Sequence, residues 1–144
     1  MLKKTIAYTN WNDEACEETF YFNLTQTELA HLEYSHGGGL TEWIKKAVET
    51  RDGKVILETF EEIIKATYGE KSLDGRTFIK NDDVFARFKG SGAYDVLYME
   101  LVTDGEKAAQ FIIDCMPKEL REEATKAVKT EQSKNANITK VEPN

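Results

Sequence analysis

The chain has 144 residues, of which 40% are hydrophobic and 31% charged, and its 19 basic and 26 acidic side chains give a formal net charge of −7. This length suffices for one domain with a proper core that needs neither metal ions nor disulfides for stability. The acidic balance disfavours nucleic-acid binding, which needs clustered Lys and Arg, and no apolar run approaches the roughly 20 residues of a membrane span.

The first 24 residues predict a β-hairpin. Apolar and polar side chains alternate over residues 5–9 and again over residues 19–24, which is the pattern of half-buried strands. The polar cluster of residues 10–13 provides the turn between them. Because an isolated hairpin is only marginally stable in water, its apolar face should pack on helices.

Two helices are expected next. Thr25 and Glu28 form a capping box, which predicts a helix that begins at Thr25 and ends at the three glycines 37–39. A second helix carries apolar residues at helical spacing from Leu40 to Val48 and is broken at residues 52–53.

The third predicted helix has the clearest apolar stripe in the sequence. Its opposite side is charged, and Gly69 stands where a glycine commonly ends a helix. The stripe consists of Ile56, Leu57, Phe60, Ile63, Ile64 and Tyr68. A polar loop over residues 70–80 is expected to follow.

The last third of the chain predicts four more helices. Asn81 can cap a short helix that ends at residues 90–92, and residues 93–102 form a helix that is apolar on nearly every side. The spacing of Thr103 and Glu106 indicates a second capping box, and the next helix has a stripe of apolar residues. This stripe consists of Ala108, Phe111, Ile112, Cys115 and Met116. Pro117 suits the first turn of a final helix.

These elements predict an α+β fold that is mostly α-helical, with an N-terminal β-hairpin followed by six or seven packed helices. Residues 1–131 form a single domain. Residues 132–144 are polar and non-periodic, so we expect a disordered tail.

No catalytic, cofactor or metal site is expected. The segment 69–72 (GEKS) departs from a phosphate-binding loop because Glu70 replaces the glycine before the lysine and a helix precedes it. His31 and His36 are five residues apart and do not share the helix face that a zinc pair needs. Nothing resembles an activated nucleophile with its base, so the chain is not expected to be an enzyme.

Cysteine use and the N-terminus indicate a cytoplasmic protein. Cys16 and Cys115 lie far apart without metal-ligand spacing, and two such thiols usually stay free in a reducing compartment. The N-terminal apolar stretch is too short and too polar for a signal peptide.

The helix predicted over residues 93–102 is the candidate partner surface, because its apolarity on all sides exceeds what one core needs. Tyr and Met are common at surfaces that adapt to a partner. The candidate partner-binding residues are Tyr94, Leu97, Tyr98, Met99 and Val102. The same residues are equally compatible with an ordinary core.

Several stretches, in order and spacing, resemble tail assembly chaperones of long non-contractile-tailed phages (siphoviruses) of Gram-positive bacteria. The resemblance covers about residues 3–120 and is carried by residues 20–25 (FYFNLT), 38–44 (GGLTEWI), 68–72 (YGEKS), 74–76 (DGR), 78–80 (FIK), 99–104 (MELVTD) and 116–118 (MPK).

The resemblance implies a helical, non-enzymatic protein of viral tail morphogenesis that works in the host cytoplasm and is not expected in the mature virion. Such chaperones bind and solubilise the tape measure protein and help to recruit tail tube subunits. They need neither cofactors, nor nucleic acid, nor a membrane. Since the tape measure protein is a long helix, several copies should line up along this client as a homo-oligomer.

Two alternatives remain at this point. The first is a structural virion component, such as a head–tail or baseplate protein of a phage or prophage. The second is an acidic protein that mimics DNA, for which the carboxylates should crowd one face. Here they alternate with Lys over most helices instead.

Overall fold

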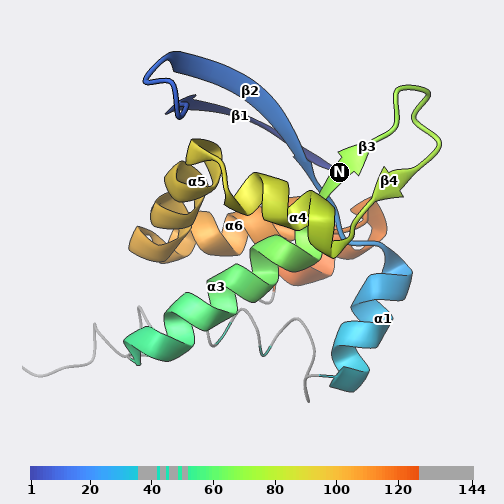
Figure 1. Ribbon diagram of the computed structural model, residues 1–144. Coiled ribbons are helices and arrows are strands. Elements are labelled where there is room, and N and C mark those ends of the chain that lie inside the picture. Colours follow the sequence, from blue (N-terminus) through green and yellow to red (C-terminus); the bar gives the residue numbers. More distant parts are fainter. Residues whose placement is uncertain (36–41, 43–44, 46–48, 50–51, 127–144) are drawn as a thin grey trace, which may run out of the picture.

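The computed structural model describes residues 1–35, 42, 45, 49 and 52–126. Its elements in chain order are β1 (Leu2–Thr9), β2 (Ala15–Phe22), α1 (Gln26–Ser35), α3 (Gly53–Thr67), β3 (Tyr68–Lys71), β4 (Phe78–Ile79), α4 (Asp82–Lys89), α5 (Gly92–Thr103) and α6 (Gly105–Cys115). Residues 118–126 are helical as well. The strands lie above the helices in Figure 1, so the predicted α+β fold that is mostly α-helical is confirmed.

The predicted N-terminal hairpin is confirmed, with strands longer than the alternation indicated. β1 pairs with β2 in antiparallel register from Leu2 opposite Phe22 to Thr9 opposite Ala15. Asn10 closes the turn: its N–H donates to the carbonyl of Glu14 at 2.9 Å, and its side-chain oxygen accepts two backbone N–H bonds. The hairpin strands therefore continue into polar residues that show no apolar alternation.

The sheet has a second half that the sequence did not predict. The four strands lie in the order β1-β2-β3-β4. The stripe of α3 was predicted to include Tyr68, but α3 ends at Thr67 and Tyr68 begins β3 without a linker. The prediction of a plain polar loop over residues 70–80 is likewise wrong, because β4 lies within it.

Gly69 does not end a helix as predicted but lies within β3, opposite Tyr21 of β2. A Cβ atom at this position would lie 2.7 Å from Cε2 of Phe78 and 2.9 Å from the carbonyl oxygen of Ile79. Glycine is needed here because β4 approaches the backbone so closely.

The core lies between the sheet and the helices and is rich in aromatic side chains. Phe22 of β2 and Phe60 of α3 are fully buried, and the ring of Phe88 stacks on that of Tyr68 with centroids 4.2 Å apart. Leu57, which the stripe of α3 placed in the core, is 48% exposed instead. The arc of α3 that neighbouring elements cover is therefore narrower than its apolar stripe.

The helix caps agree with the sequence in two cases and differ in one. Thr25 and Glu28 form the predicted reciprocal capping box, with bonds of 3.0 and 3.1 Å, and Asn81 caps α4. The second predicted capping box is wrong, because α5 continues through Thr103, whose hydroxyl donates back to a carbonyl of α5 at 2.6 Å. Asp104 caps α6 in its place.

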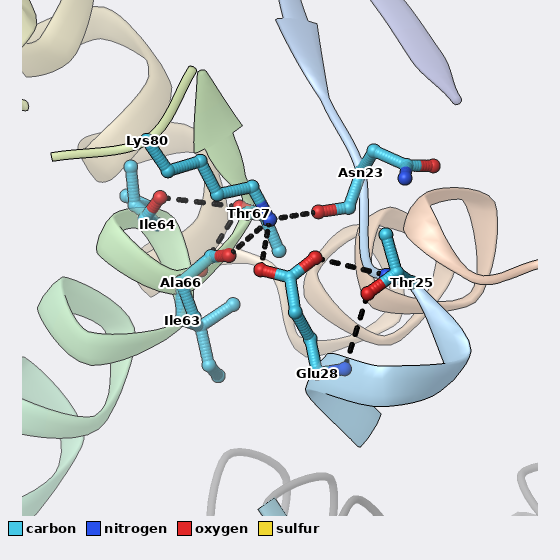
Figure 2. A network of polar contacts seen from close by, with 8 residues as sticks. All are labelled: Asn23, Thr25, Glu28, Ile63, Ile64, Ala66, Thr67 and Lys80. Carbon is cyan, nitrogen blue, oxygen red and sulfur yellow. Dashed lines mark hydrogen bonds and ion pairs between the residues drawn. The ribbon is translucent and has the colours of Figure 1, made fainter. Parts of the chain in front are cut away.

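The side chain of Lys80 joins three parts of the chain that are far apart in sequence (Figure 2). Its ammonium donates to the carbonyl of Asn23 at 2.5 Å, to Glu28 at 2.6 Å and to the carbonyl of Ala66 at 2.7 Å. All three donors of the ammonium are thereby used. We call Lys80 and these three acceptors the Lys80 junction; it fixes the start of α1 to the end of α3.

Backbone bonds reinforce the connection between β2 and α1. The N–H of Asn23 donates to the carbonyl of Thr67 at 2.8 Å, and that of Leu24 donates to the carbonyl of Cys115 at 2.7 Å. Cys115 is fully buried, and this burial raises the pKa of its thiol well above the usual range. Both cysteines are free thiols.

Two predictions fall outside the described residues. The apolar positions of the second predicted helix, Leu40 to Val48, belong to the part of the chain that the structure does not describe, and so does the tail over residues 132–144.

Candidate functional site

The predicted partner-binding residues all lie on α5, which packs against β1, α3, α4 and α6. Two polar contacts fix α5 in place. Glu100 forms an ion pair with Lys4 of β1 at 3.0 Å, and the hydroxyl of Tyr98 donates to the carbonyl of Leu57 in α3 at 2.9 Å. These contacts hold α5 between the hairpin and α3 (Figure 1).

The structure separates the five predicted residues by their exposure. Leu97 is completely buried in the core and offers no surface to a partner. Tyr94, Tyr98 and Val102 are partly buried against that core, and the rings of the two tyrosines stack with centroids 5.6 Å apart. Met99 is 50% exposed. The surface that α5 presents is therefore centred on Met99.

Two residues outside the predicted set enlarge this surface. Val96 lies three residues before Met99 on α5 and is 41% exposed, and the exposed Leu57 of α3 adjoins Tyr98. We define the α5 ridge as Val96, Met99 and Val102. The signal for it was the spacing of three residues, which places side chains on neighbouring turns of one helix face.

The aromatic side of α5 stays uncharged although the carboxylate of Glu61 lies near it. Burial, and then the negative charge of Glu61, raise the pKa of Tyr94 to about 12 and also raise that of Tyr98. Glu61 itself pairs with Lys89 of α4. Exposed apolar side chains such as those of the α5 ridge are suited to a helix that is apolar on one face.

A concave feature lies between α1 and α3. It is a cavity of about 520 Å³ whose walls are mostly apolar, with charged side chains around it. The lining residues are Leu24, Glu28, His31, Leu32, Glu62, Lys65, Ala66, Lys80, Asn81 and Asp82. Three of these residues, Glu28, Ala66 and Lys80, belong to the Lys80 junction (Figure 2). The junction therefore forms part of the cavity wall.

Within the described residues, no three His, Cys, Asp or Glu side chains stand close enough together to hold a metal ion. In the same part of the chain, none of the helices has the length and apolar character that crossing a bilayer requires.

A family model described as phage tail assembly chaperone matches residues 1–143 of the chain. Comparisons with curated proteins and with solved structures gave no match. The family match spans every element described above, including α5 and both walls of the α1–α3 cavity. At the level of the family, it confirms the resemblance found in the sequence.

Proposed function

The chain belongs to the phage tail assembly chaperone family, and we propose that it binds and solubilises the tape measure protein and helps to recruit tail tube subunits. We place it in the host cytoplasm during tail morphogenesis of a long non-contractile-tailed phage of a Gram-positive bacterium. The observation that carries the proposal is the family match across residues 1–143.

The exposed apolar surface on α5 and α3 supports a helical client. A tape measure protein is a long amphipathic helix, and its apolar face needs a covering surface before the tail tube encloses it. The α5 ridge offers side chains at helical spacing, and Leu57 continues the apolar surface onto α3. Methionine adapts its shape to varied neighbours, so Met99 suits a client whose sequence changes along its length.

Co-expression with the tape measure protein tests this proposal. The client should stay soluble with the wild-type chain and precipitate without it. Met99→Asp should abolish this rescue and leave the circular dichroism spectrum unchanged, because half of the Met99 side chain is already exposed. Tyr34→Asp is the matched control, since Tyr34 is 93% exposed on α1 and lies outside the proposed surface.

Two results would contradict the proposal. If the wild-type chain does not keep the client soluble, the chaperone function for this client is wrong. If Met99→Asp rescues the client as well as Tyr34→Asp does, the client binds elsewhere on the molecule.

The proposal also separates this chain from structural components of the particle. A chaperone leaves its client before the tail is complete, so mass spectrometry of purified virions should detect tube and tape measure proteins without this chain. Stoichiometric recovery of the chain from virions would favour the head–tail or baseplate alternative.

A further inference from the structure

A groove between α3 and α4 lies beside the exposed apolar surface of α3 and α5. Its volume is about 470 Å³, and Phe85 and Ala86 of α4 form its apolar part. The charged side chains that line it have a net charge of −2; they are Glu58, Glu61, Glu62, Asp82, Lys65 and Lys89. We call this feature the acidic groove.

Ring contacts connect the acidic groove to α5. The ring of Phe85 meets that of Tyr94 edge-on with centroids 6.1 Å apart, and Tyr94 in turn stacks on Tyr98. The hydroxyl of Tyr98 donates to the carbonyl of Leu57, which Glu58 of the groove follows directly on α3. The acidic groove and the exposed apolar side chain of Leu57 are therefore neighbours on one surface.

The two lysines of the acidic groove are already engaged. Lys89 pairs with Glu61, and Lys65 pairs with Asp82 at 3.3 Å. Each lysine therefore neutralises one carboxylate. Two of the four carboxylates, both on α3, remain without a lysine of the groove as partner.

These two carboxylates belong to Glu58 and Glu62, which are exposed and lie one helical turn apart. Lys54 stands 3.9 Å from Glu58, but the two side chains are 83% and 64% exposed, so this pair contributes little. Glu62 forms no ion pair within the described residues. Like charges four residues apart on a helix repel each other, so a cation between them would be stabilised.

A further carboxylate lies on α5 itself. Asp95 is exposed and precedes Met99 of the α5 ridge by one helical turn, so the two side chains are neighbours on one helix face. A partner with acidic side chains beside its apolar residues would bring like charges together here, which lowers affinity. The surface therefore discriminates between partners by charge as well as by apolar contact.

We propose that the client helix carries a lysine or arginine beside its apolar stripe, and that this side chain enters the acidic groove between Glu58 and Glu62. The stripe itself covers Leu57 and the α5 ridge. A lysine or arginine can lay its methylene stem along the apolar part of the groove and keep its charged end at the carboxylates. The inference rests on the proposed function and specifies its client as a basic amphipathic helix.

Binding of two synthetic helical peptides to the full chain, followed by fluorescence anisotropy, tests the proposal. Both peptides have the same leucine stripe, and the positions beside it are lysine in one peptide and glutamine in the other. The lysine peptide should bind roughly tenfold more tightly, as two exposed charge pairs would give. Replacing both Glu58 and Glu62 by Gln should reduce this preference to about twofold or less.

Two control variants separate the groove from general attraction to an acidic protein. Glu17→Gln combined with Glu119→Gln removes the same charge from exposed positions of β2 and of helix 118–126, and should keep the preference. Met99→Gln should weaken the binding of both peptides by a similar factor, because the α5 ridge contacts the leucine stripe of each. All five substituted side chains are exposed, so circular dichroism should show native folding.

Four results would overturn the proposal. The first is equal affinity of the wild-type chain for the two peptides. The others are full preference in the Glu58→Gln/Glu62→Gln variant, an equal loss of preference in the Glu17→Gln/Glu119→Gln control, and unchanged affinities in Met99→Gln.

Co-expression distinguishes this inference from the proposed function. If the wild-type chain prefers the lysine peptide through Glu58 and Glu62 but does not keep the tape measure protein soluble, only the proposed function is contradicted. If it keeps that client soluble but binds the two peptides equally, only this inference is contradicted.

Discussion

Replacing Lys80 by Met tests how much the Lys80 junction stabilises the fold. Methionine fills nearly the same volume but donates no hydrogen bonds, so Asn23 and Ala66 lose a partner for their carbonyls and Glu28 loses its counter-charge. A hydrogen bond to a charged group contributes about 1.5–3 kcal/mol, but contributions at one atom are not additive.

The exposure of the ion pair lowers the expected magnitude. The side chains of Lys80 and Glu28 are 19% and 34% exposed, so water screens part of their attraction. Water can also replace some of the lost bonds to the two carbonyls. We therefore expect Lys80→Met to lower the free energy of unfolding by about 2–4 kcal/mol.

Urea titration followed by circular dichroism measures this loss. Glu28→Gln provides the second side of a double-mutant cycle, because an amide oxygen still accepts from the N–H of Thr25 while the charge is removed. The two substitutions should be coupled by on the order of 1 kcal/mol. A loss below about 1 kcal/mol for Lys80→Met, with an unchanged denaturant slope, would refute the assignment of the junction as a stabilising contact.

Three further predictions concern stability. Phe60→Ala should lower the free energy of unfolding by roughly 3–5 kcal/mol, and a denaturant titration showing under about 1 kcal/mol would place Phe60 outside the core. Gly69→Ala should be destabilising by about 1–3 kcal/mol, because the added Cβ atom would collide with the ring of Phe78. Gly53→Ala is the control: the space around its Cβ atom is open, so it should be neutral or stabilising by up to about 1 kcal/mol. Equal melting temperatures of the two variants would contradict this. Because the pKa of Cys115 is raised in the folded protein, the thiol of the unfolded chain loses its proton at lower pH. The free energy of unfolding should therefore be constant below the ordinary thiol pKa of about 8.5 and fall as the pH rises above it. Cys115→Ala should flatten this fall, and an identical pH profile of variant and wild type would exclude the thiol as its cause.

Local sequence signals predicted the elements whose stabilising contacts are close in sequence. The Thr25–Glu28 capping box forms as expected because both bonds lie within one helical turn. The Asn81 cap and the apolar stripe of α6 succeed for the same reason. In these segments, propensity, capping and apolar periodicity favour the same structure.

The predictions failed where distant contacts decide the structure. β3 has only four residues, and its extended form depends on pairing with β2, which lies far upstream. The sequence of residues 68–71 alone does not indicate that this segment pairs with β2. Thr103 is a suitable cap by sequence, but Asp104 can satisfy two N–H groups of α6 while the hydroxyl of Thr103 bonds back into α5.

The candidate surface was predicted as a segment but not residue by residue. α5 is apolar on nearly all sides, so its periodicity does not reveal which face the core covers. Only the packing shows that Leu97 is buried and Met99 exposed. It also shows that Tyr98, held by Leu57 and stacked on Tyr94, is a poor position for a surface substitution.

The bond between the N–H of Leu24 and the carbonyl of Cys115 bears on how the protein matures during translation. The β1–β2 hairpin has local contacts and can form soon after it leaves the ribosome. The start of α1, in contrast, reaches its final place only when Cys115, far downstream, has emerged and α6 has folded. Contacts of such large sequence separation form late and slow the folding of a domain. A nascent chain therefore cannot complete the α1–α3 cavity, which is present only in nearly full-length molecules.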